Sequence, residues 1–198
     1  LAAQFVPMII LGYKLYSGTA QLGSFVASIN IIWNLNWSMY DLARNLIRCV
    51  GEPEKRFGED ALRMLRAVRF AAQLNFIIEA ETFAAIGQQA TSIELIAMER
   101  IQVELSKIFT ASHVAQGIHY LETSGLAAYL PGQFDATAWQ DFNSDNRQVG
   151  WAYFCLVNED ATLLTNYRCS NKDKQFTKLV VEAYDCFVRG ITLPELLR

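Results

Sequence analysis

One acidic residue and three arginines form a regularly spaced cluster near the middle of the first half of the chain. The cluster consists of Asp60, Arg63, Arg66 and Arg69, each three residues after the one before. A carboxylate beside a guanidinium places a hydrogen-bond acceptor next to a fork of donors. Side chains three residues apart on a helix are neighbours, so Asp60 and Arg63 can act together if the segment is helical.

Two nucleobases match an Asp–Arg pair. Cytosine presents an amine beside the acceptor N3, and adenine presents an amine beside the acceptor N1. Uracil and guanine place a carbonyl oxygen and an N–H at these positions, and two mismatched buried contacts cost on the order of a few kcal/mol. Asp60 and Arg63 could therefore select A and C without a template. Arg66 and Arg69 could hold a triphosphate or an RNA backbone. The alternative is that all four residues form surface salt bridges.

A helix within residues 51–76 must position this cluster. Apolar residues recur between the arginines at helical spacing, which keeps the charged and apolar side chains on different flanks. Pro53 and Gly58 favour a bend, and Glu59 and Asp60 place negative charge in the first turn, where the exposed N–H groups attract it.

Composition describes a folded, globular protein, and the helical patterns along the chain indicate a mainly α fold with a possible small β element at the start. The chain has 198 residues, 52% of them hydrophobic, and a net charge of −3. This charge excludes a general polyanion binder, so any RNA site must be local to the arginine flank. No run approaches the roughly 18 apolar residues of a membrane helix, and no signal peptide is recognised. No membrane or DNA partner is predicted, and no pattern specifies an oligomeric state.

Cysteine and histidine spacing gives no metal motif. Cys49, Cys155, Cys169 and Cys186 form no CxxC pair, so we interpret them as reduced thiols of a cytoplasmic protein. His113 and His119 are six residues apart and would lie on different faces of a helix. The four tryptophans are expected mostly in the core rather than stacked on bases.

Helices are predicted along most of the chain after Phe76. Thr91 and Ser92 are expected to cap the second of them, Ser112 the third, and Gly125 to end the third. Residues 1–37 suggest short strands or buried irregular structure, and residues 41–50 a short helix or turn. The helices are expected at residues 79–90, 93–109, 114–123, 150–158, 161–167 and 172–188.

The run RCVGEPEKRFGEDALRMLRAVRFAAQLNF (residues 48–76) closely resembles the neck of class II tRNA nucleotidyltransferases, the family of CCA-adding enzymes and poly(A) polymerases. The family's EDxxR motif is present at residues 59–63. A second family signature, ER…EL.K, is matched by Glu99, Arg100, Glu104, Leu105 and Lys107. Residues 125–132 and 170–176 resemble the bacterial body domain, and the resemblance covers about residues 41–190.

This resemblance implies a neck that selects nucleotides and a body that is helical. In the family, the acid and the first arginine of the motif pair with the base of ATP or CTP. The implied roles are base selection for Asp60 and Arg63 and nucleotide binding for Arg66 and Arg69. The implied substrates are ATP, CTP and the tRNA 3′ end, with Mg²⁺ as the cofactor. The implied domains are residues 1–48 (a head remnant or replacement), 49–112 (neck) and 113–198 (body).

The family's head motifs are not found. Its GG…RD motif and the DxD pair that binds two metal ions are absent from the sequence, and two-metal phosphoryl transfer needs such carboxylates. We therefore assign no catalytic or metal-binding residue, and we expect this chain alone to bind nucleotide weakly at most and not to polymerise. Ala97 stands where the family usually has a capping serine, which costs about 1 kcal/mol at one helix start.

Two other interpretations remain open. The chain could be a non-catalytic helical module that binds RNA or a partner, with a replaced or redesigned N-terminal segment. It could also be a folded scaffold with no retained activity, which would be favoured if Arg56 or Arg63 occupied Asp60 in a salt bridge with no open cleft beside it.

Overall fold

A computed structural model describes residues 26–27 and 44–188. The chain divides into two compact units, Leu1–Arg44 and Asn45–Arg198, and only the second is described at length. Val26 and Ala27 are helical, which differs from the strands or irregular structure expected there. The rest of the expectation for residues 1–37 lies outside the described residues.

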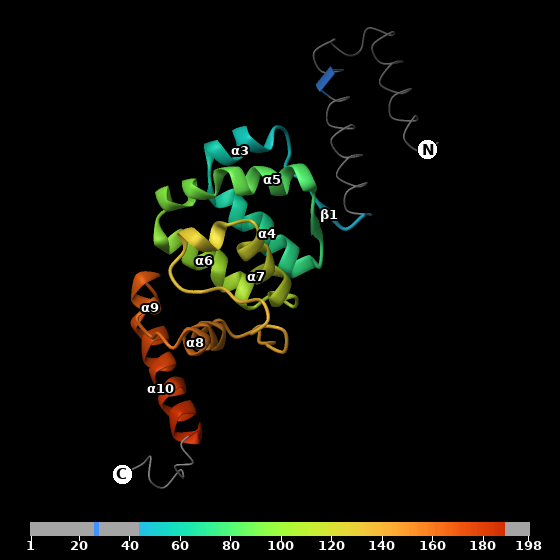
Figure 1. Cartoon of the computed structure of the whole chain (residues 1–198). Helices are drawn as coiled ribbons and strands as arrows, with labels where there is room; N and C mark the ends of the chain where they lie inside the picture. Colours follow the sequence, from blue (N-terminus) through green and yellow to red (C-terminus); the bar gives the residue numbers. More distant parts are fainter. Residues whose placement is uncertain (1–25, 28–43, 189–198) are drawn as a thin grey trace, which may run out of the picture. The chain divides into compact units, whose positions relative to one another are not determined.

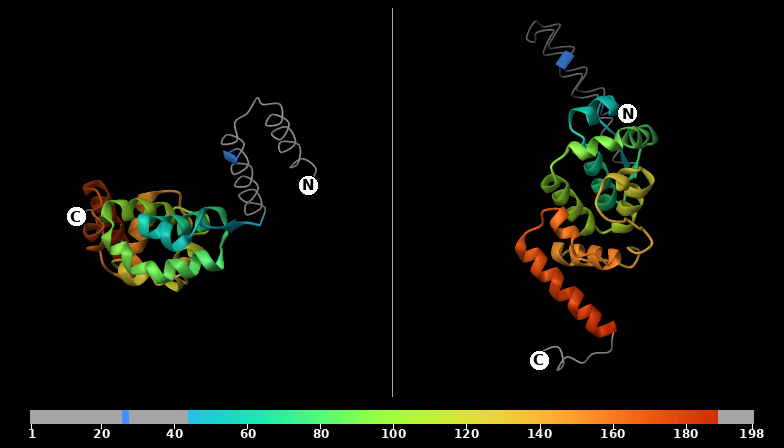
Figure 2. Two further views of the ribbon diagram at one scale, coloured as in Figure 1. Left: turned by 90° about the horizontal axis from the view of Figure 1, so that it is seen from above. Right: turned by 60° about the vertical axis from the view of Figure 1, so that its left-hand side comes forward.

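The second unit is mainly helical, as predicted (Figure 1). Figure 2 shows the same helices from two further sides. Its elements, in chain order, are β1 (Leu46–Ile47), α3 (Pro53–Glu59), α4 (Leu62–Leu74), β2 (Ile77–Ile78), α5 (Ala80–Gln89), the 3₁₀ helix η1 (Ala90–Leu95), α6 (Met98–Phe109), α7 (Val114–Thr123), the 3₁₀ helix η2 (Leu126–Tyr129), α8 (Arg147–Asn158), α9 (Leu163–Asn166) and α10 (Asn171–Val188).

Strands β1 and β2 pair in parallel, with Leu46 opposite Ile77 and Ile47 opposite Ile78. The expectation of a helix or turn at residues 41–50 was therefore wrong at Leu46–Ile47. Two backbone bonds hold the pair: Ile77 N–H donates to the Asn45 carbonyl (2.8 Å), and Glu79 N–H donates to the Ile47 carbonyl (2.9 Å). The pairing fixes the segment that leads from β1 toward α3.

The central helix is α4, which contacts α6 and α7. Its apolar flank is buried, including Met64, Leu65 and Val68 at 0% exposure. Helix α7 comes so close that a Cβ added to Gly117 would lie 2.8 Å from the Ala72 Cβ. Glycine is therefore required at this crossing, and α4 has one covered flank and one flank left for other residues.

Several helix boundaries differ from those expected. The helix predicted at residues 93–109 is two elements, η1 and α6, separated at Ile96 and Ala97. Ala97, not Thr91 or Ser92, is the N-cap residue of α6, and it makes no side-chain cap. His113, not Ser112, precedes α7. Local cap preferences are weak beside the packing that decides where a helix begins.

An aromatic core joins α6 to α8 and to the loop between η2 and α8. Phe109 lies 4.8 Å from Trp139 and 5.0 Å from Trp151, between ring centroids. Both tryptophans are fully buried, which confirms their predicted core role, and Phe154 is fully buried beside them. Trp33 and Trp37 lie outside the described residues.

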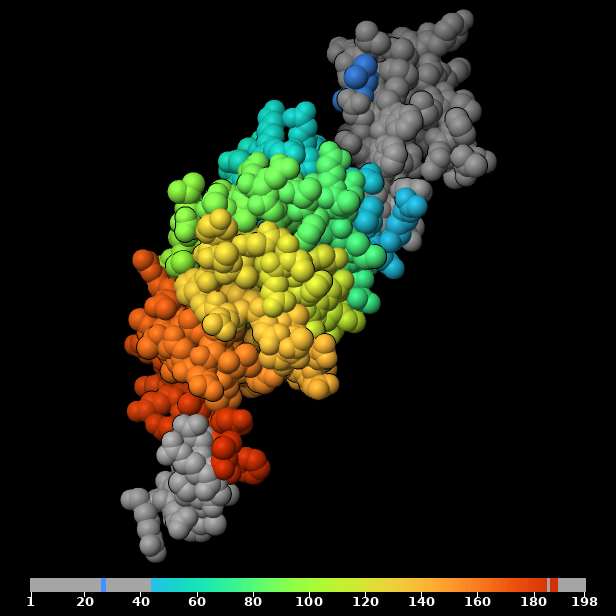
Figure 3. Space-filling view, viewed as in Figure 1, coloured from blue at the N-terminus to red at the C-terminus, as the bar shows by residue number. Residues whose placement is uncertain are grey.

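Helix α10 continues past this core. In Figures 1 and 3 its C-terminal half (red) extends away from the other described helices, and Phe187 there is 82% exposed. None of the described helices combines the length and the apolar run needed to cross a membrane.

Candidate nucleotide-selecting site

Asp60 lies in the break between α3 and α4. The break falls at Asp60 and Ala61, because α3 ends at Glu59 and α4 begins at Leu62. Gly58, where a bend was expected, lies inside α3, and Glu59 and Asp60 precede the first turn of α4 instead of belonging to it. The Asp60 Oδ1 atom accepts a hydrogen bond from the Leu62 backbone N–H (3.2 Å). This bond satisfies one of the free N–H groups at the start of α4 and fixes the carboxylate there.

The side-chain partner of Asp60 is Arg100, not Arg63. Arg100 Nη2 lies 3.2 Å from Asp60 Oδ2 and 3.4 Å from Oδ1, so a residue of α6 reaches the start of α4. Arg63 touches Asp60 only through the backbone, donating its N–H to the Asp60 carbonyl (3.0 Å). The side chain of Asp60 is 24% exposed, and its Oδ2 has only this contact, so it keeps acceptor capacity.

Arg63 is the arginine of the cluster without a carboxylate partner among the described residues. Its Nε is buried and also lacks a hydrogen-bond partner there. By contrast, Arg56 pairs with Glu59 at 2.7 Å, and Arg48 pairs with Glu79 at 3.1 Å. A buried guanidinium nitrogen without a partner is costly, so Arg63 is suited to receive an acceptor from outside.

Arg66 and Arg69 both point to Glu104 of α6. Arg69 Nη1 lies 2.9 Å from Glu104 Oε2, and Arg66 Nε lies 3.6 Å from Oε1. Lys107 Nζ approaches the same carboxylate at 3.8 Å. The side chain of Glu104 is only 5% exposed. Three cations therefore compensate one buried anion.

The contact between Arg69 and Glu104 is an ion pair without hydrogen-bond alignment. Although the atoms are 2.9 Å apart, Glu104 Oε2 and Arg69 Nε both lack a hydrogen-bond partner among the described residues. Arg69 also covers Phe70, with its guanidinium carbon 4.1 Å from the ring centroid. Arg69 is thus mainly held inside the structure, whereas Arg66, with 46% of its side chain exposed, can still reach a ligand.

A pocket of about 340 Å³ lies beside α4. Its polar wall is cationic, and its apolar wall comes from α3, α4 and the segment after β1. Asp60 is not among the residues that line it. The lining residues are Ile47, Arg48, Cys49, Val50, Arg56, Phe57, Arg63, Arg66, Ala67, Phe70 and Thr82.

Cys49 lies on the wall of this pocket as a neutral thiol. Burial raises its pKa, against the smaller lowering effects of Arg56 and Arg63. The Cys49 N–H donates to Thr82 Oγ1 (3.1 Å), which in turn donates to Glu79 (2.9 Å). These bonds tie the segment after β1 to α5, so the pocket has a fixed wall opposite α4.

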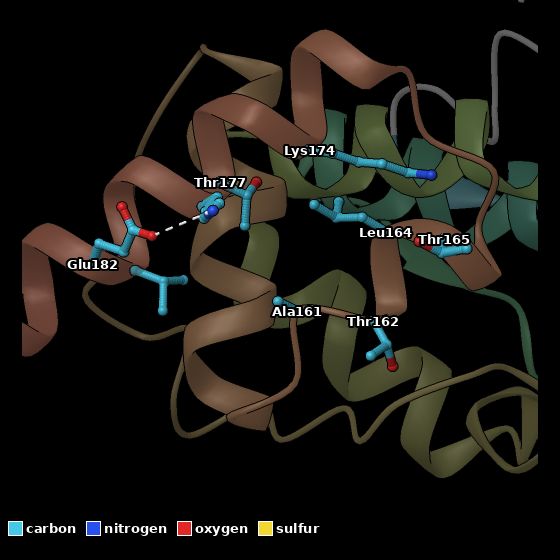
Figure 4. A pocket seen from close by; sticks show the side chains of 9 residues that line it. Ala161, Thr162, Leu164, Thr165, Lys174, Thr177 and Glu182 are labelled. Carbon is cyan, nitrogen blue, oxygen red and sulfur yellow. Dashed lines mark ion pairs between the residues drawn. The ribbon is translucent and has the colours of Figure 1, made fainter.

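A second pocket, of about 450 Å³, lies between α9 and α10 (Figure 4). Lys174 and Lys178 of α10, Thr165 of α9 and Thr162 just before α9 line it. Lys178 is paired with Glu182 at 3.7 Å. No aromatic ring and no arginine line it. The first pocket therefore has the richer chemistry for a nucleotide.

Among the described residues, no group of three or more His, Cys, Asp or Glu side chains could hold a metal ion. The four cysteines are free. Burial raises the pKa of Cys155 to about 12 and that of Cys169 to about 11, so both are inert core thiols at neutral pH.

Sequence reasoning missed three residues of this site: Arg100 as the partner of Asp60, Glu104 as a buried anion, and Phe70 on the pocket wall. A signal for Glu104 was present. It lies at helical spacing among Ile101, Leu105 and Ile108, which are all fully buried. An acid on an apolar flank indicates a buried partner on the facing helix.

Comparison with known proteins gives consistent matches. Residues 75–137 match the family described as "Probable RNA and SrmB- binding site of polymerase A". The CCA-adding enzyme of Streptococcus mutans is 35% identical over 167 residues, covering 78% of this chain and 41% of that protein. The CCA-adding enzyme of Levilactobacillus brevis is 54% identical over 91 residues, covering 46% of this chain and 23% of that protein.

A solved structure matches as well. The crystal structure of the Bacillus stearothermophilus CCA-adding enzyme in complex with CTP is 34% identical, with a TM-score of 0.66, and the match covers 73% of this chain and 39% of that chain. The present chain thus spans less than half the length of each of these relatives.

Proposed function

We propose that this chain, which belongs to the class II tRNA nucleotidyltransferase family over its neck and body regions, selects ATP and CTP through Asp60 and Arg63 for addition to the tRNA 3′ end. The observation that carries this proposal is the state of Arg63. It lines a cationic pocket and has no ion-pair partner among the described residues, whereas Arg48, Arg56 and Arg66 on the same wall are each paired.

Each of the two selecting groups has a defined task. The Asp60 carboxylate would accept the exocyclic amine of cytosine or adenine, and Arg63 would donate to N3 or N1 of the ring. Arg100 holds the Asp60 carboxylate in place. Arg66 would turn from Glu104 toward the phosphates, because its ion pair is long and its side chain half exposed. Arg69 would contribute to nucleotide binding from inside the structure, through its contacts with Glu104 and Phe70.

Nucleotide titrations of the purified chain test base selection. We expect CTP and ATP to bind about tenfold or more tightly than UTP and GTP. Asp60→Ala should remove this discrimination, and Arg63→Ala should weaken the binding of all four nucleotides. Arg100→Ala keeps the Asp60 carboxylate but removes its ion pair. This variant shows whether discrimination depends on the carboxylate alone or also on the position that Arg100 gives it. Asp141→Ala, at an exposed carboxylate, is the control. Discrimination that survives Asp60→Ala would refute the proposal.

Polymerisation by this chain alone is not expected. The sequence contains no DxD pair, and two-metal transfer of a nucleotide needs such carboxylates. The measurement is incorporation of labelled CTP into tRNA in the presence of Mg²⁺. Incorporation that EDTA abolishes would overturn this expectation.

A second candidate function is a helical RNA-binding module. The match of residues 75–137 to an RNA-binding family favours it. Gel-shift titrations with tRNA distinguish the two functions. Salt-sensitive binding that is unchanged in Asp60→Ala indicates backbone binding. Binding of tRNA together with lost ATP and CTP preference in that variant indicates that nucleotide selection is also present.

A further inference from the structure

Phe70 is a large aromatic residue on the wall of a cationic pocket. Its side chain is 42% exposed, although α4 buries most of its other apolar residues. It lines the pocket together with Arg63 and Arg66. An exposed ring beside guanidinium groups is the combination that single-stranded nucleic acids use for stacking and for backbone contact.

The ring is held in a fixed position from inside the protein. Glu104 is buried and pairs with Arg69, and Arg69 in turn lies over the Phe70 ring at 4.1 Å. A guanidinium over an aromatic face is attractive and keeps the ring from turning. Arg69 occupies one face of the ring, and a base stacking on Phe70 would use the other.

The ring lies too far along α4 to stack on the base that Arg63 would read. Arg63, Arg66 and Phe70 fall on one face of the helix, at positions i, i+3 and i+7. A separation of seven residues is about 10 Å along the helix axis. Arg66 lies between Arg63 and Phe70 along the helix, at a place where a phosphate joining two nucleotides would be.

We propose that the Phe70 ring is a stacking platform for a second nucleobase, distinct from the base that Asp60 and Arg63 select. This inference rests on the proposed nucleotide-selecting function and adds a second base position to it. The second base can come from the 3′ end of an RNA strand or from a second free nucleotide. The chemistry is the same in both cases: one π face of the base against the ring, and its phosphate on Arg66.

The test uses 2-aminopurine, whose fluorescence falls when the base stacks. One arm titrates the full chain into a single-stranded hexanucleotide RNA that ends in 2-aminopurine. The other arm uses 2-aminopurine riboside triphosphate. Quenching in the first arm alone assigns the platform to the RNA end, and quenching in both assigns it to any base. Absence of quenching in both arms overturns the proposal.

Three substitutions at one position separate stacking from apolar packing. Phe70→Leu keeps an apolar side chain without a π face, and we expect about tenfold weaker binding and loss of quenching. Phe70→Tyr keeps the ring and should retain both. Phe70→Ala should match the leucine variant. If the leucine variant binds and quenches like the wild type, the residue serves an apolar protein contact and the proposal is wrong.

Failure of this inference can be distinguished from failure of the proposed function. Phe70→Leu should leave the preference for CTP and ATP over UTP and GTP unchanged, because Asp60 and Arg63 are intact. Asp60→Ala should remove that preference but leave the quenching of the RNA probe unchanged. Thermal unfolding of each variant checks that the effects do not come from loss of folding, since an exposed residue of this kind contributes little to stability.

Discussion

Helix α6 meets two neighbouring helices with opposite kinds of surface. Toward α4 it presents Arg100, Glu104 and Lys107, which form ion pairs across or along the contact. Toward α8 it presents Phe109 and Ser106. Phe109 packs among aromatic rings, and Ser106 accepts a hydrogen bond from the Trp151 indole N–H (2.8 Å).

The two contacts differ in what they contribute. Burial of aromatic rings gains free energy in proportion to the apolar area removed from water. Burial of Glu104 costs free energy that its three cations only offset, so a well-packed apolar contact would serve stability as well or better. The ion pairs between α4 and α6 are therefore best explained by the site that they hold in place, and the aromatic contact between α6 and α8 by stability.

The largest effect is expected on the aromatic side. Trp151→Ala removes a fully buried ring and should lower the free energy of unfolding by about 3 to 5 kcal/mol, with no change in nucleotide preference among molecules that remain folded. Urea denaturation followed by circular dichroism measures it. Phe187→Ala, at an 82% exposed ring, should change stability by less than about 0.5 kcal/mol.

The next effect is expected on the charged side. Glu104→Ala leaves Arg69 without its anion and should cost about 3 kcal/mol. It should also release the Phe70 ring and weaken binding of the 2-aminopurine RNA. Trp151→Ala should not weaken that binding in molecules that remain folded. Glu99→Ala is the matched control on the same helix, because its pair with Arg168 is exposed, and it should change stability little. Equal effects of both glutamate variants would remove the distinction drawn between the two contacts.

Close packing on the aromatic side is tested with glycine. A Cβ added to Gly150 would lie 2.9 Å from the Phe109 Cβ, whereas one added to Gly87 would lie 3.5 Å from the nearest atom. Gly150→Ala should cost about 1 to 3 kcal/mol through overpacking. Gly87→Ala in α5 should stabilise by about 0.5 kcal/mol, because it removes backbone freedom from the unfolded chain. Differential scanning calorimetry of both variants measures the difference.

A charged cluster also lies on the α8–α10 contact, around Asp173. Burial by itself raises the pKa of this carboxyl, but hydrogen bonds from Ser170 and Gln148 and the pair with Arg147 outweigh it, so the net pKa is lowered from 3.8. A lowered folded pKa means that the carboxylate stabilises the fold above about pH 4. This contribution is lost as the pH falls through the lowered value.

Acid denaturation therefore tests that cluster. Stability should fall below about pH 4 by at most about 1.4 kcal/mol per pH unit from this group. Asp173→Asn should be less stable at pH 7 and show a shallower pH dependence in urea titrations at pH 3 to 7. An unchanged slope would assign the acid sensitivity to other carboxyls.

A modest effect is expected at the start of α6. Ala97 is the N-cap residue and offers no side-chain acceptor. Ala97→Ser should stabilise the protein by about 1 kcal/mol, because the hydroxyl accepts a free N–H group of the first turn. Thermal unfolding measures the shift. Ala84→Ser, at an exposed position inside α5, is the control and should give no gain.

Much of the helical framework was predictable from local patterns. The predicted helices at residues 79–90, 114–123 and 172–188 agree with α5, α7 and α10 to within one residue, since hydrophobic periodicity and turn residues act over a few positions. The split into η1 and α6 was missed, because Ile96 and Ala97 carry no strong helix-breaking signal. The short pairing of β1 with β2 was missed because two-residue strands have no periodicity.

The sequence by itself determined that Arg63, Arg66 and Arg69 share one flank of a helix, because helical geometry depends only on spacing, whereas Asp60 lies in the break before that helix. Only the tertiary structure decided how they differ: Asp60 meets Arg100, 40 residues away, Arg66 and Arg69 meet Glu104, and Arg63 has no such partner among the described residues. The physical reason is that ion pairs across α4 and α6 depend on how two helices cross. Both helices bury apolar side chains, such as Leu65 and Val68 of α4 and Ile101 and Leu105 of α6, and spacing along the chain does not specify how these side chains pack.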